Sequence, residues 1–210
     1  MHRPEKVPPR GRDRTTTAPL HRHLARELIA SATRSDEQWA RLSRTHPADQ
    51  QVGASRHIDH TNAELLRRRI ADYGWPDVPL VGEGGATAAW RIALRADTHP
   101  DFQRLASRLM QQAVERGTAS QTLWAHLYDR SLLNSGHPQY YGTQYRLGPD
   151  GPRMQPVADP DTELDARRAA VNLPPAALAL QRLRERLAAD PVTGSEPYAD
   201  TPGAELADAA

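Results

Sequence analysis

The sequence lacks cysteine, and lysine is almost as scarce, since Lys6 is the only lysine in the chain. Without cysteine there is no disulfide framework, no thiol catalysis, and no zinc or iron–sulfur centre ligated by cysteine. No apolar run approaches the roughly 20 residues that cross a bilayer, and the N-terminus lacks the apolar core of a secretory signal. These absences predict a cytoplasmic protein that does not enter a membrane.

Apolar residues and net charge are also scarce: hydrophobic residues make up 38% of the chain and the formal net charge is +1. The low net charge gives no overall basic field, so we expect no nucleic-acid partner. Both ends are rich in Pro, Thr, Ala and charge, with no apolar period. We therefore predict disordered tails at 1–18 and 191–210, flanking one folded domain at 19–190.

Within that domain, apolar residues recur at helical spacing, and Gly and Pro mark the breaks. The alternation of Tyr141, Thr143 and Tyr145 before the turn sequence GPDG indicates a short β-hairpin. We predict a mostly α fold, a single domain of six or seven helices with a small β-hairpin. The expected helices cover about 21–44, 59–73, 86–96, 100–116, 121–135, 162–171 and 175–189.

The most unusual stretch is DYGWPDVPLVGEGGATAAW, Asp72 to Trp90, which places glycines and the acid Glu83 between two tryptophans. It has neither the spacing of a dinucleotide-binding loop nor that of a Walker loop. We predict that the junction lines a pocket, with Trp75 and Trp90 as its walls and Glu83 as an acid/base group. The alternatives are that Glu83 caps a helix and that both indoles lie in the core, where a carboxylate satisfies a buried indole N–H.

A set of short motifs in fixed order extends from about Leu24 to Leu180: DYGWP, LVGEGGATAAW, ADTHPDFQ, YDRSLL, GHPQYYGTQY and DARRAAVNLPP. Together they resemble a bacterial family catalogued only as a domain of unknown function. One position departs from that resemblance, because Arg95 stands where the family usually has histidine. The resemblance implies the same fold and supplies no established activity.

Several of the matching positions carry chemistry. Asp97 and Asp129 are acid/base candidates, and Arg95 and Arg130 can hold an anion. Asp129 can orient His126 as a general base, or Asp129 and Arg130 can each brace a different loop; Asp97 can instead cap the following helix. Further along the chain, Tyr141 and Gln144 can orient a ligand.

A metal site has weaker support. His57 and His60 lie three residues apart with Asp59 between them, but no third ligand or HExxH pattern accompanies them. We therefore expect no metal site and no cofactor.

Two functions follow from these candidates. The first is a small enzyme or ligand-handling protein acting on a polar, anionic small molecule by acid–base chemistry such as hydrolysis, cyclisation or isomerisation. In that case Glu83, Asp97 and Asp129 act as acids or bases, while Trp75, Trp90, Arg95, Arg130, Tyr141 and Gln144 bind the ligand. The alternative is a non-catalytic binding or interaction module whose polar residues form a structural network. A pocket where several of these residues meet distinguishes the first from the second.

Overall fold

The computed structural model describes residues 19–42, 49–158, 163–189 and 205–207, and within them it contains seven helices and three strands. This confirms the mostly α prediction for a single domain. The elements are α1 (Arg22–Leu42), α2 (Asp49–Tyr73), α3 (Val78–Leu94), α4 (Pro100–Glu115), α5 (Gln121–Leu133), β1 (Gln144–Gly148), β2 (Gly151–Met154), α6 (Leu164–Ala170), α7 (Ala176–Ala189) and β3 (Glu205–Ala207).

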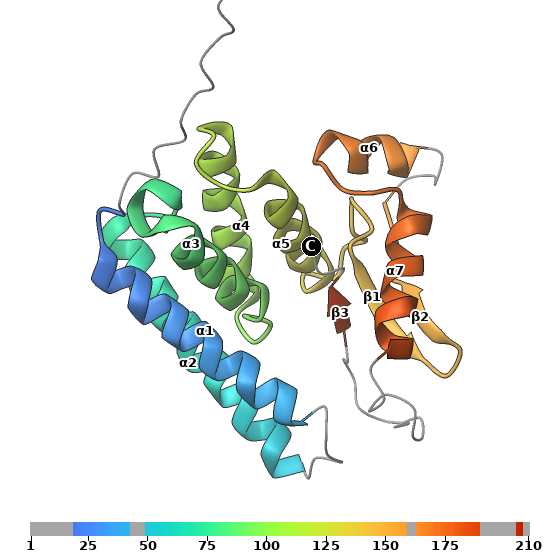
Figure 1. Ribbon diagram of the computed structural model, residues 1–210, viewed down its shortest axis with the longest axis horizontal. Helices are drawn as coiled ribbons and strands as arrows, with labels where there is room; N and C mark the ends of the chain where they lie inside the picture. Colours follow the sequence, from blue (N-terminus) through green and yellow to red (C-terminus); the bar gives the residue numbers. More distant parts are fainter. Residues whose placement is uncertain (1–18, 43–48, 159–162, 190–204, 208–210) are drawn as a thin grey trace, which may run out of the picture.

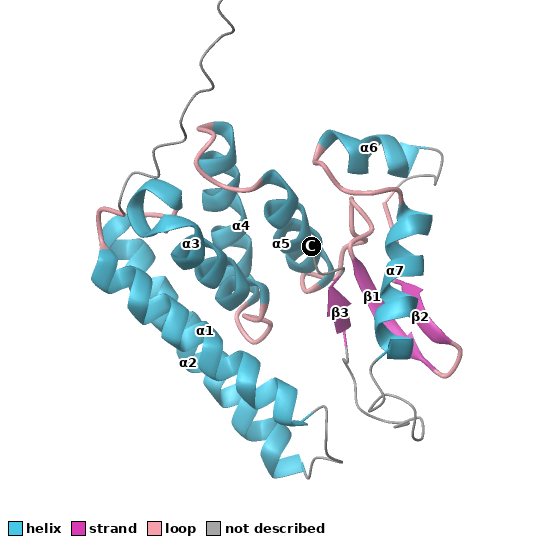
Figure 2. Ribbon diagram, viewed as in Figure 1, coloured by secondary structure: helices cyan, strands magenta, loops and turns pink. Residues whose placement is uncertain are grey.

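The helices α1 and α2 form a long antiparallel pair, and α3 packs across α1 (Figure 1). Next come α4 and α5, and then the small sheet with α6 and α7 beside it (Figure 2). The main core lies between α1, α2, α3, α4 and α5, where Leu28, Leu66, Ala89 and Leu127 are fully buried. Helix α3 therefore lies at the centre of the helical part of the domain.

Helix α2 begins ten residues before the predicted start near Asp59. It starts at Asp49, so Asp59 lies in the middle of the helix and does not cap it. The prediction was wrong because the first half of α2 turns polar side chains, Ser55 and Asp59, toward the neighbouring helix, and both are buried. A helix face that buries polar residues shows no apolar period in the sequence.

Helix α3 also begins earlier than predicted. Asp77 caps its N-terminus by accepting a hydrogen bond from the Leu80 amide at 3.3 Å, and the helix then kinks at Gly82, where φ is 73°. Only glycine adopts this left-handed conformation readily. The glycines that precede the predicted helix start near residue 86 therefore lie within one kinked helix.

Gly85 allows α3 to approach α1 closely. A Cβ atom at this position would lie 3.3 Å from the Ala25 Cα of α1 and 2.7 Å from the Val81 Cβ of the preceding turn. The glycine-rich sequence thus serves helix packing, and the side chains of Trp75 and Trp90 complete the same core.

The predicted hairpin is present, and its turn is the GPDG sequence that closes at the Gly148–Gly151 pair. Of the three alternating residues, only Tyr145 lies in a strand, because β1 begins at Gln144. Tyr141 and Thr143 belong to a loop whose amides bond to a buried carboxylate and not to a neighbouring strand. On its other edge β1 pairs with β3, with Tyr145 opposite Leu206.

The predicted N-terminal tail, 1–18, lies outside the described residues. Of the predicted C-terminal tail, 191–210, the structure describes only Glu205–Ala207, as strand β3. Among the helices that are described, none is both long and apolar enough to span a bilayer.

Substitution of Gly85 tests the close approach of α3 to α1. We expect Gly85→Ala to lower the free energy of unfolding by about 1–3 kcal/mol, because the new methyl group meets Val81 and the α1 backbone. Gly84→Ala is the matched control, since its Cβ would meet only the flexible end of Ile29 at 3.4 Å. Urea unfolding checks both; equal stabilities of the two variants would contradict the packing role.

Candidate functional site

The carboxylate of Asp129 binds the loop that follows α5. It is fully buried, and its two oxygens accept hydrogen bonds from the amides of Tyr140 (2.8 Å), Tyr141 (2.9 Å) and Thr143 (2.9 Å). The Thr143 hydroxyl donates a fourth bond at 2.9 Å. Asp129 is therefore occupied in holding the loop, which is the bracing role that the sequence left open.

The same loop is held from its carbonyl side by Arg168 of α6. This guanidinium is also fully buried, and it donates hydrogen bonds to the carbonyls of Tyr141 (2.8 Å) and Gly142 (2.9 Å). It reaches Pro174 as well, at 2.6 Å. We call this arrangement the loop clamp: Asp129 accepts from the N–H groups of Tyr140, Tyr141 and Thr143, and Arg168 donates to the C=O groups of Tyr141 and Gly142.

Asp97 and Arg130 pair with each other at the junction of α3, α4 and α5. The Arg130 Nε atom donates to Asp97 at 2.9 Å, and a second guanidinium nitrogen contacts the other carboxylate oxygen. Gln103 also donates to Asp97, at 3.3 Å. Asp97 does not cap α4, whose N-cap is His99, so both residues are used to join three helices.

The residues of the glycine-rich junction lie elsewhere. Glu83 is exposed on α3, and Trp75 and Trp90 are buried in the main core. The Trp90 indole nitrogen is buried and has no hydrogen-bond partner among the described residues. The expected bond between an indole and a carboxylate occurs instead at Trp39, which donates to Asp59 at 2.8 Å.

Tyr141 and Gln144 lie beside the loop clamp and are both buried. Burial raises the pKa of Tyr141 to about 12, so its hydroxyl stays neutral near pH 7. The Gln144 side-chain amide donates to the Thr143 hydroxyl at 3.0 Å and to the His126 carbonyl at 3.4 Å. Both side chains are thus part of the packing of the loop.

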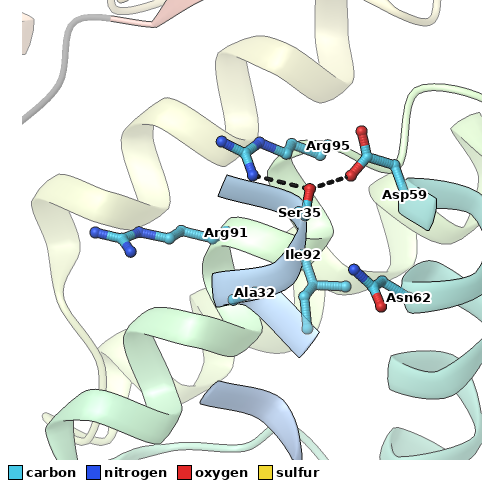
Figure 3. Close-up of a pocket in the computed structure, with 7 residues that line it drawn as sticks. All are labelled: Ala32, Ser35, Asp59, Asn62, Arg91, Ile92 and Arg95. Atoms are coloured by element: carbon cyan, nitrogen blue, oxygen red, sulfur yellow. Dashed lines mark hydrogen bonds between the residues drawn. The ribbon is translucent and has the colours of Figure 1, made fainter. Parts of the chain in front are cut away.

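Polar side chains from three helices meet at a second place, between α1, α2 and α3. Here a small hollow is lined by Ala32, Ser35, Asp59, Asn62, Arg91, Ile92 and Arg95 (Figure 3). We call it the α1–α2–α3 hollow. Of the nine site candidates predicted from the sequence, Arg95 alone lines it.

In this hollow, Ser35 lies between the carboxyl group of Asp59 and the guanidinium group of Arg95. Its hydroxyl donates to Asp59 at 2.5 Å and accepts from the Arg95 guanidinium at 3.0 Å, as Figure 3 shows. Both Ser35 and Asp59 are buried. The second oxygen of Asp59 accepts the bond from Trp39, so both carboxyl oxygens are held by residues one turn apart on α1.

Burial raises the pKa of Asp59 above its ordinary value, because a charged carboxylate is poorly solvated there. The bonds from Ser35 and Trp39 and the charge of Arg95 act in the opposite direction, while the charge of Asp97 adds to the increase. Burial also raises the pKa of Asp129, against four hydrogen bonds that oppose the change. Asp59 has only two such bonds, so it is the carboxyl group better suited to exchange a proton.

Two arginines form the rim of the hollow. Arg91 and Arg95 lie one helical turn apart, and both hold the Asp36 carboxylate, at 3.0 Å and 2.6 Å. Their side chains are 50% and 34% exposed, so they can exchange Asp36 for a dissolved anion. The space between the lining atoms is ≈ 150 Å³, but this includes open solvent, and the side chains as placed leave no room for a molecule of the size of water. A ligand therefore has to displace a lining group such as Asp36, and sites for drug-sized molecules are far larger, at roughly 300–1,000 Å³.

Sequence reasoning missed Ser35 and Asp59 as site residues. The signal was present: extending the buried stripe of Ile70, Leu66 and Asn62 backward by three or four residues leads to Asp59. On α1, Ser31 and Ser35 continue the buried stripe of Leu24 and Leu28 in the same way. A polar residue in a core stripe marks a buried polar contact, but its partner depends on how the helices pack.

Comparison with known proteins identifies the family of the chain. The family described as "Family of unknown function (DUF6624)" matches residues 24–188, which is most of the chain. The protein belongs to this family. No curated protein and no solved structure matches the chain. The matched range contains the residues of both the loop clamp and the α1–α2–α3 hollow.

The residues that were considered for a metal are not assembled into a ligand set. His57 and His60 are exposed on α2. Within the part of the chain that the structure describes, no group of three or more His, Asp or Glu side chains is placed to hold a metal ion.

Replacing Asp129 tests the loop clamp. In Asp129→Asn, an NH₂ group faces at least one loop N–H, so a donor meets a donor. Because hydrogen bonds to a charged group contribute about 1.5–3 kcal/mol each, we expect the free energy of unfolding to fall by about 3 kcal/mol or more. Asp101→Asn, at an exposed acid, is the control and should change little. A fully stable Asp129→Asn variant would contradict the clamp.

Replacing Asp59 tests its raised pKa through the pH dependence of stability. An acid with a raised pKa binds more protons in the folded state, so the wild type loses stability relative to Asp59→Asn as pH rises above about 4. Below that pH the difference should be constant. Urea unfolding from pH 3.5 to 8 checks this. If the stability of the wild type instead rises relative to that of Asp59→Asn with increasing pH, the pKa of Asp59 is lowered and not raised.

Proposed function

We propose that the protein handles a small anionic molecule at the α1–α2–α3 hollow, with Asp59 as the acid/base group of the site. The observation that carries this proposal is the convergence of Ser35, Asp59 and Arg95 from three helices on one hollow. The side chains come from positions that are distant in sequence, and the polar groups are closely spaced within an otherwise apolar interface.

The rim supports an anionic ligand. Arg91 and Arg95 already hold a carboxylate, that of Asp36. A carboxylate or phosphate on a ligand has the same geometry for guanidinium groups, so the ligand would take the place of Asp36.

The carboxyl group of Asp59, which lines the hollow, is suited to acid–base chemistry. A carboxyl group with a raised pKa is partly protonated closer to neutral pH than a solvated one, and it can both accept and donate a proton. Trp39 fixes its second oxygen, so the group keeps one orientation. This chemistry needs no cofactor, and hydrolysis, cyclisation and isomerisation all fall within it.

A non-catalytic interaction module is the second candidate. It is favoured by the loop clamp and by the Asp97–Arg130 pair, in which polar residues predicted to act on a ligand bind other parts of the chain. In such a module the Ser35–Asp59 bond would simply join α1 to α2.

Thermal shift with small carboxylates and phosphates distinguishes the two functions. A ligand of the hollow stabilises the folded state by mass action, by about 2.7 kcal/mol at one hundred times its dissociation constant. We expect a rise in melting temperature for the wild type, and a smaller rise for Arg91→Gln and Arg95→Gln.

Arg104→Gln is the matched control, because Arg104 also binds an acid and a serine but lies on α4, away from the hollow. It should keep the full response. If no small anion raises the melting temperature, or if all three arginine variants respond alike, the hollow is not the site and the module gains support.

A further inference from the structure

Resting on the proposed function, we propose that Ser35 is a nucleophile that accepts an acyl group from a small ester or thioester whose acyl part carries a negative charge. Asp59 takes the proton of Ser35, Trp39 orients Asp59, and Arg91 and Arg95 hold the charged end of the acyl group.

The geometry has the three parts that an activated hydroxyl requires. Ser35 and Asp59 lie within hydrogen-bond distance, at 2.5 Å, with the hydroxyl as the donor. The base is in turn held by a third group, the Trp39 indole at 2.8 Å. A nucleophile, a base in contact with it, and a residue that orients the base form the arrangement by which such sites are recognised.

Arg95 supplies the positive charge that stabilises the carbonyl oxygen during attack. Its guanidinium lies 3.0 Å from the Ser35 oxygen, close enough to stabilise negative charge that develops on the carbonyl oxygen under attack. Two other buried serines lack this combination: Ser31 accepts from Arg34, and Ser131 donates to a backbone carbonyl. Ser35 is the serine that contacts both a carboxyl group and a guanidinium group.

The reaction balances within these groups. The Ser35 oxygen attacks the acyl carbon while its proton passes to Asp59, and the bond to the leaving alcohol or thiol breaks. Asp59 then protonates the leaving group, which leaves Ser35 as an ester. Water attacks that ester with Asp59 as the base, the acid product departs, and the proton returns to Ser35.

Access to Ser35 requires the groups around it to move, because the hollow has no room for a molecule of the size of water. The serine is 2% exposed, and Arg95 and Asp36 are the partly exposed groups beside it. Binding of the acyl charge by the arginines releases Asp36, and this exchange opens the approach to the hydroxyl. The negative charge on the substrate is thus a condition for reaction.

The test is reaction of the full chain with 4-nitrophenyl hydrogen succinate, an ester with a charged acyl group. Nitrophenol release is followed by absorbance, and acid-quenched samples are mapped by peptide mass spectrometry. We expect a succinyl group on Ser35, formed faster than acetyl from neutral 4-nitrophenyl acetate. Because Lys6 is the only lysine, background labelling of amines is confined to Lys6 and the N-terminus and is easily separated.

Variants assign the roles. Ser35→Ala should abolish nitrophenol release above background, and Asp59→Asn should slow it by about a hundredfold or more, the usual contribution of a general base. Ser31→Ala, one turn away on α1, should react at the wild-type rate. Circular dichroism and melting temperatures confirm that each variant is folded.

The outcomes separate this inference from the proposed function. If wild-type protein forms no Ser35 ester and releases no nitrophenol above background, Ser35 is not a nucleophile, whatever the variants do. If small anions nevertheless raise the melting temperature through Arg91 and Arg95, the hollow remains a binding site. If the ester forms but charged and neutral esters react alike, the assignment of the substrate class is overturned.

Discussion

The C-terminal half of the domain depends on the loop clamp, in which the peptide groups of one short loop are held between two buried, opposite charges. Asp129 comes from α5 and Arg168 from α6, so the loop joins the helical core to the helices beside the sheet. A buried charge is costly unless its hydrogen bonds are complete. The loop meets that requirement for Asp129 with four donors, and as a result β1 starts at a defined place immediately after it.

Among the residues that the structure describes, the two buried carboxyl groups, those of Asp59 and Asp129, have contrasting surroundings. Asp129 meets three amides and a hydroxyl, whereas Asp59 meets one hydroxyl and one indole and faces a hollow rimmed by arginines. Full hydrogen bonding suits a carboxylate that stays charged and never moves. Incomplete hydrogen bonding next to an anion-binding rim suits one that exchanges protons. The proposed chemistry therefore belongs to α1, α2 and α3, while the better satisfied acid has a structural role.

Much of the fold was predictable because the responsible signals are local. The starts of α4 and α5, at Pro100 and after Ser120, follow from first-turn proline and an N-terminal cap, and the hairpin turn follows from GPDG. The starts of α2 and α3 were not predictable in this way. In α2 a polar stripe is buried against another helix, and in α3 a glycine bends the helix without ending it.

The candidate site shows the same division. Local patterns and composition were enough to predict the helical class, the absence of thiol chemistry and the identity of polar residues such as Asp97, Asp129 and Arg130. The packing of the helices was needed to show that Asp97 pairs with Arg130, that Asp129 binds a loop, and that Ser35, Asp59 and Arg95 share a hollow. The physical reason is that a carboxyl group acquires its role from the donors and charges around it, and those come from helices that are remote in sequence.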